Sequence, residues 1–496
     1  GLIYLTNTSF TPQNGNFAQG CTIYLDADLD MSPYSGTVTE DNGTYTFTAT
    51  EAYTALGGGT IYYSNFVLDG RGHTIHNFCF SANPNYNYRT ALICGMGAPG
   101  AVKNIRFDNC QAISNGEYML NAIIVGQSRG TIEDVVVENC LVVGRSDYTG
   151  AIAGRNSGTL QNCVVSDTAI HAKSYTSAFA GVSSTDDSSS TAVCRGNTAT
   201  NVTITGTHYV GGIAGQISNG FNGGTVTIED CFFSGDITAT DQCGLIAGVV
   251  SSNAGEIVIS NCTAVGTLSS TSPDTSGAII GRGKRPNNPE IPSPDIRDCI
   301  AVLVPADKVD EIVETENGTI QFPSDSDIVL SDSGTTVQLP EGEPGSITKD
   351  ELILPPGSKI TSADSTATLE HGGVMTTDNK VIGSSSNGTL PTVNNDHSIT
   401  IPAGGSYQGV EYPYGGIVYS DGTVVANAAP DPDPDPAPAY RDDDDDGYSV
   451  SVPSASSIKH GSVTVSPKSA KKGTTVTITV KPDKGYELDD LTVTDR

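Results

Sequence analysis

The sequence is poor in tryptophan, methionine and positive charge. It has no Trp and only 4 Met in 496 residues, and 25 Lys and Arg stand against 56 Asp and Glu, which gives a formal net charge of −31. Charged residues make up 16% of the chain, below the roughly 25% of ordinary globular proteins. Gly (56) and Pro (26) interrupt it often, which argues against an all-helical protein. Because such negative charge repels phosphate backbones and anionic lipid headgroups, we expect no nucleic-acid partner.

Long apolar runs and metal-binding motifs are also missing. No run approaches the roughly 18 apolar residues that span a bilayer, so we expect no membrane insertion within this chain. The first residues lack the basic region of a signal peptide, and any export signal or wall anchor is expected to lie outside the given sequence. The seven histidines never form the His-Glu-x-x-His pattern of a zinc protease. We expect neither a metal nor a cofactor.

What the sequence does contain is a repeat. A short apolar box that ends in glycine recurs every 27 to 34 residues. The boxes are Leu92–Gly95, Ile123–Gly126, Ala151–Gly154, Ala178–Gly181, Gly212–Gly215, Leu245–Gly248 and Ala278–Gly281. Between them stand β-branched runs that end in Asn-Cys or Asp-Cys, namely Asn109–Cys110, Asn139–Cys140, Asn162–Cys163, Asp230–Cys231, Asn261–Cys262 and Asp298–Cys299. Cys79 and Cys194 keep the period without the Asn or Asp neighbour.

Units of about 30 residues are too short to fold alone, so they must stack on one another. Apolar positions such as Val102, Ile105 and Phe107 alternate and then skip a residue, as expected of strands that bend at corners. The sequence therefore predicts an all-β protein whose residues 65–305 form a parallel β-helix of about eight turns. The general rule for parallel crossovers makes it right-handed.

These residues resemble a known family of bacterial surface proteins, those with the Gly-Leu-Uncharged-Gly (GLUG) repeat. The box Gly212–Gly215 followed by Val226–Cys231 is the copy most similar to the motif, and Val67–Ile75 is similar to the segment that often precedes such repeats. Most copies depart from the motif by carrying Ala or Leu at its first glycine. GLUG repeats occur in large adhesins and in some immunoglobulin A proteases, so the resemblance implies a fold and an extracellular, cell-surface location rather than an activity.

The C-terminal residues are similar to a different module, a divergent internalin-type B-repeat. The match is carried by Gly461–Pro467, Gly473–Val480 and Gly485–Tyr486. With it, the expected organisation is an N-terminal β cap with entry strands (1–64), the β-helix (65–305), a second β-rich region of extra solenoid turns or a small sandwich (306–428), an Asp/Pro-rich linker (429–457) and a partial B-repeat-like β module (458–496).

The repeat also predicts how the cysteines are used. Eight of them, from Cys79 to Cys299, follow the period, so we expect one inward ladder of packed free thiols. Disulfides between neighbouring turns and a metal site are the alternatives. The preceding Asn or Asp suits a corner, because these residues tolerate the left-handed backbone conformation.

Two sets of residues are candidates for ligand contact. The first is a row of tyrosines that precede the box glycines by six to eight residues: Tyr88, Tyr118, Tyr148, Tyr175 and Tyr209. Stacked in register, they would form either an internal ladder or an exposed strip on which sugar rings could lie. The second is a basic patch on an acidic protein that could meet an acidic glycan: Arg129, Arg145 and Arg155.

Two functions remain open at this stage. The leading hypothesis is a non-enzymatic, exported bacterial surface protein, an adhesin or extracellular binding scaffold whose partner is a glycan or a host or cell-surface protein. The alternative is a carbohydrate-active β-helix enzyme, a polysaccharide lyase or glycoside hydrolase, which needs a clustered pair of carboxylates or an Arg or Lys base. The adjacent pairs Glu133–Asp134, Asp186–Asp187 and Glu229–Asp230 are poor candidates, since neighbouring residues on a strand point to opposite faces.

Overall fold

The protein is almost entirely β structure. The computed structural model describes residues 20–50, 65–81, 89–114, 120–145, 147–219, 223–251, 255–284, 293–315, 318–331, 334–362, 365–394, 396–429, 448–449, 461–466, 469–470 and 476–482. Helical structure within these residues consists of short 3-10 turns at Ser32–Tyr34, Pro273–Thr275 and Ala306–Glu311. Two compact units, 1–428 and 429–496, divide the chain.

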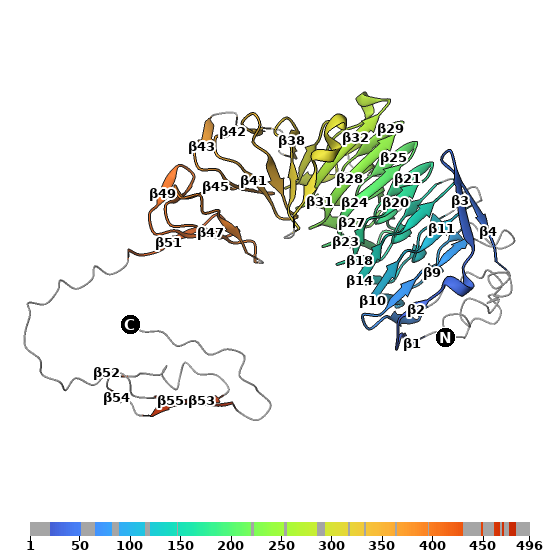
Figure 1. The fold of residues 1–496 in the computed structure, drawn as a ribbon, viewed down its shortest axis with the longest axis horizontal. Helices are drawn as coiled ribbons and strands as arrows, with labels where there is room; N and C mark the ends of the chain where they lie inside the picture. Colours follow the sequence, from blue (N-terminus) through green and yellow to red (C-terminus); the bar gives the residue numbers. More distant parts are fainter. Residues whose placement is uncertain are drawn as a thin grey trace, which may run out of the picture. The chain divides into compact units, whose positions relative to one another are not determined.

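Residues 22–303 form a parallel β-solenoid, a coil whose turns pair strand to strand (Figure 1). Seven stacked strands make one wall: β9 (Ile93–Met96), β13 (Val125–Ser128), β17 (Ala153–Asn156), β22 (Ala180–Ser184), β26 (Ala214–Ser218), β30 (Ala247–Ser251) and β33 (Ile280–Lys284). Six shorter strands make the second wall: β8 (Arg89–Thr90), β12 (Leu120–Asn121), β16 (Thr149–Gly150), β21 (Ser174–Ser177), β25 (His208–Gly211) and β29 (Asp241–Gly244).

The third wall is a large sheet that bends at two corners in each turn. Its parallel strands are β1 (Thr22–Tyr24), β2 (Leu29–Asp30), β5 (Val67–Asp69), β6 (Thr74–His76), β7 (Cys79–Ser81), β10 (Ala101–Asp108), β11 (Gln111–Ile113), β14 (Thr131–Glu138), β15 (Leu141–Val143), β18 (Thr159–Gln161), β19 (Val164–Ser166), β20 (Ala169–His171), β23 (Thr191–Arg195), β24 (Thr198–Thr205), β27 (Thr225–Glu229), β28 (Phe232–Ala239), β31 (Glu256–Ser260), β32 (Thr263–Ser270), β34 (Asp295–Arg297) and β35 (Ile300–Leu303). Each long strand buries its alternate residues in the interior.

The fold class predicted from the repeat is confirmed, with fewer complete turns than expected. The seven strands from β9 to β33 enclose about six full turns, because the coils at both ends are partial. At the N-terminal end β1 and β2 pair with β5 and β6, and the hairpin of β3 (Thr37–Asp41) and β4 (Thr44–Thr48) follows them.

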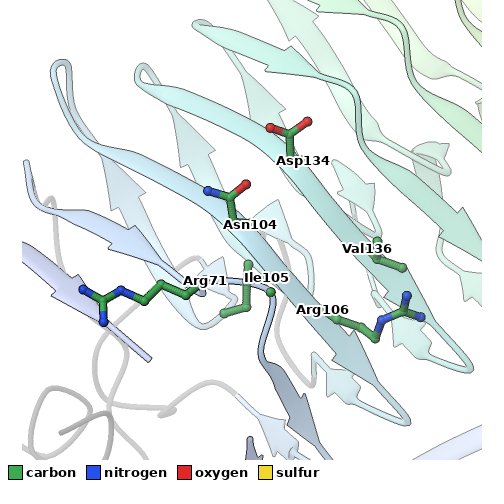
Figure 2. Close-up of a pocket in the computed structure, with 7 residues that line it drawn as sticks. Arg71, Asn104, Ile105, Arg106, Asp134 and Val136 are labelled. Atoms are coloured by element: carbon green, nitrogen blue, oxygen red, sulfur yellow. The ribbon is translucent and has the colours of Figure 1, made fainter. Parts of the chain in front are cut away.

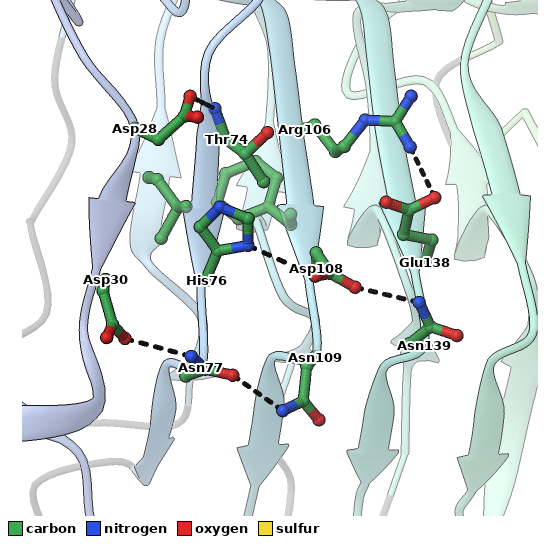
Figure 3. Close-up of polar contacts among 12 residues, drawn as sticks. Asp28, Asp30, Thr74, His76, Asn77, Arg106, Asp108, Asn109, Glu138 and Asn139 are labelled. Carbon is green, nitrogen blue, oxygen red and sulfur yellow. Dashed lines mark hydrogen bonds and ion pairs between the residues drawn. The ribbon is translucent and has the colours of Figure 1, made fainter.

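The corners are set by Asn and Asp in the left-handed backbone region. Eleven of them have φ between 47° and 58°: Asn77, Asn104, Asn109, Asp134, Asn139, Asn162, Asp167, Asn201, Asp230, Asn261 and Asp298. Their side chains link successive coils through hydrogen bonds, as from Asn109 Nδ2 to Asn77 Oδ1 (2.7 Å) and from Asn139 Nδ2 to Asp108 Oδ1 (2.9 Å) (Figure 3). The corner role expected for the Asn and Asp residues that precede a cysteine is therefore confirmed.

Six of the eight periodic cysteines form two columns, so the single inward ladder predicted from their spacing is wrong. Gln111 pairs with Leu141, which brings Cys110 beside Cys140 at the second corner of the large sheet. The first corner lies between β18 and β19 in one coil and between β23 and β24 in the next. It carries a different column: Cys163, Asn197, Cys231, Cys262 and Cys299. Both corners use a left-handed residue followed by a buried one. The Asn-Cys pattern therefore cannot tell one corner from the other.

Asn197 occupies the place in this column where the period suggested Cys194. Cys194 lies three residues earlier, inside β23 and opposite Leu160. The Asn197 side chain is fully buried, accepts the Cys163 N–H at 2.8 Å and donates to the Leu160 carbonyl at 3.1 Å. A buried amide thus joins coils here through paired hydrogen bonds.

The thiols act as packing groups. All eleven cysteines are free, and all except Cys21 are buried. Corner thiols donate to nearby carbonyls, as Cys163 Sγ does to Gln161 O at 3.3 Å and Cys231 Sγ to Glu229 O at 3.2 Å. Burial raises the pKa of Cys163 to about 12, so this thiol is neutral and unreactive at physiological pH.

The box glycines let two walls touch backbone to backbone. A Cβ added at Gly181 would stand 2.4 Å from Thr149 N and 2.5 Å from Tyr175 O. At Gly215 an added Cβ would stand 2.5 Å from Thr176 N. Any side chain there would push the seven-stranded wall away from the six-stranded one, which is why the repeat ends in glycine.

Residues 306–428 form antiparallel sheets instead of further solenoid turns. The parallel stack ends where β35 pairs antiparallel with β38 (Asp327–Leu330). An eight-stranded sheet follows: β36 (Val313–Glu314), β37 (Ile320–Phe322), β40 (Gly345–Ile347), β41 (Glu351–Leu354), β44 (Gly373–Thr376), β45 (Val381–Gly383), β48 (Gly405–Tyr407) and β49 (Val410–Tyr412). Two smaller sheets hold β39 (Thr336–Gln338), β42 (Ser358–Thr361) and β43 (Thr366–Leu369), and β46 (Thr392–Val393), β47 (Ile399–Ile401), β50 (Gly416–Val418) and β51 (Val424–Ala426).

The core continues from the solenoid into this region. Phe232 and Ile300 of the last coils share one buried cluster with Phe322 and Leu352 of the antiparallel sheets. In the second unit, β53 (Gly461–Ser466) pairs with β55 (Thr477–Pro482), and β52 (Tyr448–Ser449) pairs with β54 (Ser469–Ala470). Most of the expected linker at 429–457 lies outside the described residues.

Candidate functional site

Three of the five predicted tyrosines stack on one face of the solenoid. Tyr148 directly precedes β16, while Tyr175 and Tyr209 lie in β21 and β25, whose registers place the three in one column. The ring centroids of Tyr148 and Tyr175 are 4.7 Å apart at an angle of 12°, and those of Tyr175 and Tyr209 are 4.6 Å apart at 18°. We call these three residues the tyrosine stack.

The described residues on either side of this column are not tyrosines. Leu120 lies in register with Tyr148, and Arg89 lies in register with Leu120. Tyr88 and Tyr118 themselves lie outside the described residues. On the other side, the register of β25 and β29 places Gln242 next to Tyr209.

All three tyrosines adopt the left-handed conformation that the other corners give to Asn and Asp. Their φ values are 61° for Tyr148, 53° for Tyr175 and 59° for Tyr209. For a bulky side chain this conformation is an outlier that costs on the order of 1–3 kcal/mol. Three such residues in successive coils must be compensated, and part of the compensation is the contact between neighbouring rings.

The side chains of the tyrosine stack are partly buried. The stack is thus neither the internal ladder nor the fully exposed strip that the sequence left open. Rings stacked at these small angles cover one another's faces, so each ring between two others exposes mainly its edge. Burial raises the pKa of Tyr175 to about 12, and burial followed by the charge of Asp147 raises the pKa of Tyr148. The Tyr148 and Tyr175 phenols are therefore neutral at physiological pH, able both to donate and to accept hydrogen bonds.

A histidine and an aspartate lie beside the tyrosine stack, and the sequence analysis did not single them out. His208 Nδ1 is 2.7 Å from Asp241 Oδ1, and the His208 ring lies 6.1 Å from that of Tyr209 at a tilt of 53°. Only the register of β25 and β29 reveals the pair, because the two residues are 33 positions apart.

The structure brings together two of the three predicted arginines. Arg129 Nε lies 2.7 Å from Asp186 Oδ2 and an Arg155 guanidinium nitrogen 2.9 Å from Asp186 Oδ1. Asp186 belongs to the Ser/Asp-rich insertion at 183–191, so these ion pairs fasten the insertion to the solenoid. Arg145 is exposed, and no ion pair joins it to this cluster in the described segments.

Neither a metal site nor a membrane helix is found in the part of the chain that the structure describes. No group of three or more His, Cys, Asp or Glu side chains there is placed to hold a metal ion. No helix in the same segments is long and apolar enough to cross a bilayer.

A second candidate, also missed by the sequence analysis, is a shallow hollow of about 460 Å³ on the outer face of the first coils (Figure 2). It is lined by Arg71, Gly72, Asn104, Ile105, Arg106, Asp134 and Val136. Asn104 and Asp134 are corner residues with positive φ, and the register of β10 and β14 places them in one column.

Comparison with known proteins identifies the C-terminal module. Residues 449–496 match the family model of the divergent InlB B-repeat domain, which agrees with the resemblance seen in the sequence. The chain matches no curated protein. A crystal structure of a putative immunoglobulin A1 protease from Bacteroides ovatus is similar over 60% of this chain and 85% of its own, with 20% identity and a TM-score of 0.35; this score is too low to support an argument.

The fold and the B-repeat together fit an extracellular repeat protein, a parallel β-solenoid followed by a surface-type module. The relation to GLUG-repeat proteins stays a prediction.

Proposed function

We propose that this protein is an exported bacterial surface protein that works without catalysis, as an adhesin or extracellular binding scaffold. Its ligand is a glycan, or a glycan-bearing host or cell-surface protein, held at least in part by the tyrosine stack. The β-solenoid and the B-repeat support the extracellular setting, and the large negative charge disfavours anionic partners.

The observation that carries the proposal is the strained conformation of the tyrosine stack. Other corners of the same solenoid use Asn or Asp at nearly the same φ, at much lower cost. Packing alone does not require Tyr in this column, since Leu120 and Gln242 occupy its neighbouring positions. Strain that is kept in successive coils, at side chains that stay partly exposed to solvent, is typical of a surface selected for contact.

The chemistry of the tyrosine stack indicates how it would hold a glycan. Three phenol groups recur at the spacing of the coils and present ring edges and hydroxyls, with His208 and Asp241 beside them. Tyrosine suits such contacts because it combines apolar area with a polar end and loses little side-chain entropy on binding.

The alternative of a carbohydrate-active enzyme has less support. Asp186, the carboxylate nearest to the arginines, already accepts both Arg129 and Arg155. Those guanidinium groups thus hold the segment that contains Asp186. To act as the base of a lyase, either arginine would first have to break its ion pair with Asp186.

A binding screen run beside an activity assay tests the proposal. Purified protein is applied to a glycan array and to immobilised host-cell proteins, and incubated in parallel with polysaccharides while reducing ends are measured. We expect binding and no release of product. Steady release of reducing sugar by the purified protein would overturn the non-enzymatic assignment.

Two substitutions test the role of the tyrosine stack. Tyr175→Ala removes the central ring and should weaken binding about tenfold or more, as loss of an aromatic anchor usually does. Tyr175→Phe keeps the stacking and removes one hydroxyl, so it separates ring contact from hydrogen bonding. The matched control is Tyr419→Ala, an exposed tyrosine (41%) in the antiparallel region. If the control and Tyr175→Ala bind equally well, the tyrosine stack is not the contact surface.

A further inference from the structure

The hollow on the first coils has the composition of a binding site rather than of a packing defect. Two arginines, an asparagine and an aspartate line it together with the half-buried side chain of Val136. In Figure 2 the side chains of Arg71 and Arg106 extend away from each other. Its volume of about 460 Å³ falls within the range of roughly 300–1,000 Å³ that is usual for ligand sites.

Both arginines that border the hollow are held in place before any ligand arrives. The Arg71 guanidinium lies 3.9 Å from the centre of the Tyr24 ring and donates to Asp26 Oδ1 at 2.8 Å. Arg106 donates to Glu138 Oε2 at 2.5 Å across the coil boundary (Figure 3). One carboxylate engages only part of the five N–H donors of each guanidinium. Each arginine thus keeps N–H donors for a ligand. Because both side chains are already oriented, binding costs less side-chain entropy.

Asp134 is an acceptor without a partner at the same place. At comparable corners the Asn side chain of one coil donates to Asp or Asn of the coil before it, as Asn201 does to Asp167 at 2.6 Å. Asn104 follows this rule by donating to Asp69. The carboxylate of Asp134 receives no hydrogen bond from any of the described residues, so the chain of cross-coil bonds is interrupted inside the hollow.

The charges around the hollow disfavour an anionic ligand. Each nearby cation is matched by a carboxylate: Arg71 by Asp26, Lys103 by Asp69 and Arg106 by Glu138. The unpaired carboxylate of Asp134 then leaves a local excess of negative charge. A neutral polyhydroxylated ligand avoids this repulsion, because its hydroxyl groups can donate to Asp134 and accept from the arginines and from Asn104.

We propose that the hollow bordered by Arg71, Asn104, Arg106 and Asp134 is a binding site for a neutral saccharide. The inference rests on the proposed function, because it names a ligand class and a second contact site for the same scaffold. The site is distinct from the tyrosine stack, which lies in the six-stranded wall.

The test uses the whole chain and defined sugars. Neutral tetrasaccharides of β-1,4-linked glucose, mannose and galactose, with tetragalacturonate as the acidic counterpart, are titrated by isothermal calorimetry. Asp134→Asn keeps the corner residue and removes the charge, while Arg106→Gln removes the guanidinium. Each should weaken binding of the best neutral sugar about tenfold, the usual effect of losing one hydrogen bond to a charged group.

Two matched variants control for indirect effects. Asp230→Asn makes the same change at another corner in the column of Asp134, and Arg195→Gln breaks a similar cross-coil ion pair, with Glu229. Both should bind like the unmodified protein, and circular dichroism should show all four variants folded.

The possible failures can be told apart. If Tyr175→Ala loses binding while Asp134→Asn and Arg106→Gln do not, the hollow is not a saccharide site, but the proposed function stands. Tighter binding of tetragalacturonate than of any neutral sugar would overturn the ligand class. If the protein binds a host protein but no saccharide, the saccharide site is wrong, but the proposed function as an extracellular binding scaffold stands. If it binds neither, both fail.

Discussion

The solenoid and the antiparallel region that follows it are built from similar β-rich sequence, yet they pair their strands differently. In the solenoid each strand pairs with strands about 30 residues away in the sequence, as Thr131 pairs with Ala101. In the antiparallel region, hairpin partners that are close in sequence, such as Gly373 and Gly383, alternate with more distant ones, such as Ile320 and Ile347. Large exposed apolar side chains also differ in distribution. Among the described residues only Tyr24 of the solenoid belongs to this group, against seven beyond residue 305: Val313, Val329, Leu390, Val410, Tyr414, Tyr419 and Val425.

The difference teaches where each region can tolerate change. A column of the solenoid repeats one environment in every coil, so a residue that does not fit disturbs two neighbours. The antiparallel region has open turns, often at a glycine with positive φ and free space around it, such as Gly388. Substitutions should therefore cost more in the columns than at the turns.

The largest expected effect is at a box glycine. Gly181→Ala places a Cβ within 2.6 Å of the backbone of Thr149, Tyr175 and Tyr148, and should lower the free energy of unfolding by about 3 kcal/mol. Gly388→Ala meets no atom within 4 Å and is strained only by its φ of 83°, so about 1 kcal/mol is expected. Urea titration of both variants measures the difference. Equal losses would contradict the backbone-to-backbone role of the boxes.

The next effect concerns the buried amide in the cysteine column. Asn197→Ala leaves the Cys163 N–H and the Leu160 carbonyl without their partner, which should cost about 2–3 kcal/mol. Asn201→Ala, at the next corner, removes an exposed contact to Asp167 and should cost about 1 kcal/mol or less. Thermal unfolding followed by circular dichroism compares the two, and a smaller loss for Asn197→Ala would mean that the column does not depend on this amide.

A buried carboxyl in the antiparallel region gives a pH-dependent prediction. Burial, with a smaller effect from Asp350, raises the pKa of Glu351 from 4.5 to about 7. The folded state therefore holds the proton more tightly than the unfolded chain, and the contribution of this group to stability is lost as pH rises from 4.5 to 7. Glu351→Gln should raise the free energy of unfolding at pH 8 by about 1–2 kcal/mol and have little effect at pH 4.

The measurement for Glu351→Gln is denaturant unfolding at both pH values. An equal change at pH 4 and pH 8 would show that packing, and not the charge, is responsible. Glu411→Gln, at an exposed carboxyl in the same eight-stranded sheet, is the matched control.

The smallest expected effect is at the surface of the solenoid. Arg195→Gln breaks the ion pair with Glu229, whose two side chains are 51% and 28% exposed, and should change stability by less than about 1 kcal/mol. Unfolding at low and at high salt measures it. A larger loss would indicate that cross-coil ion pairs stabilise the stack as its buried columns do.

Much of the fold could be predicted from the repeat, because the period at which the coils stack is visible in the sequence. The box glycines and the Asn or Asp corners recur at fixed intervals, and both features turned out to have the structural reasons expected of a coil. The tyrosine row was predicted in part for the same reason. Tyr148, Tyr175 and Tyr209 precede their glycines by six residues each, and all three stack.

The prediction of a single cysteine ladder failed because the same Asn-Cys motif occurs at two different corners of the coil. Cys140 and Cys163 both follow Asn, yet they lie at different corners, since the two corners share one backbone geometry. Residues at the hollow gave no motif at all, because Arg71, Arg106 and Asp134 come from three different coils.

By itself, then, the sequence determined the class of fold, the length of the repeat and the residues that turn its corners, because each of these depends on local conformational preference and on spacing along the chain. Register was decided only by the tertiary structure: which cysteines share a column, which tyrosines stack, that Asn197 replaces a thiol, and that a hollow opens between Arg71 and Arg106. Register depends on the best simultaneous fit of all neighbouring coils, including their insertions, and no single repeat contains that information.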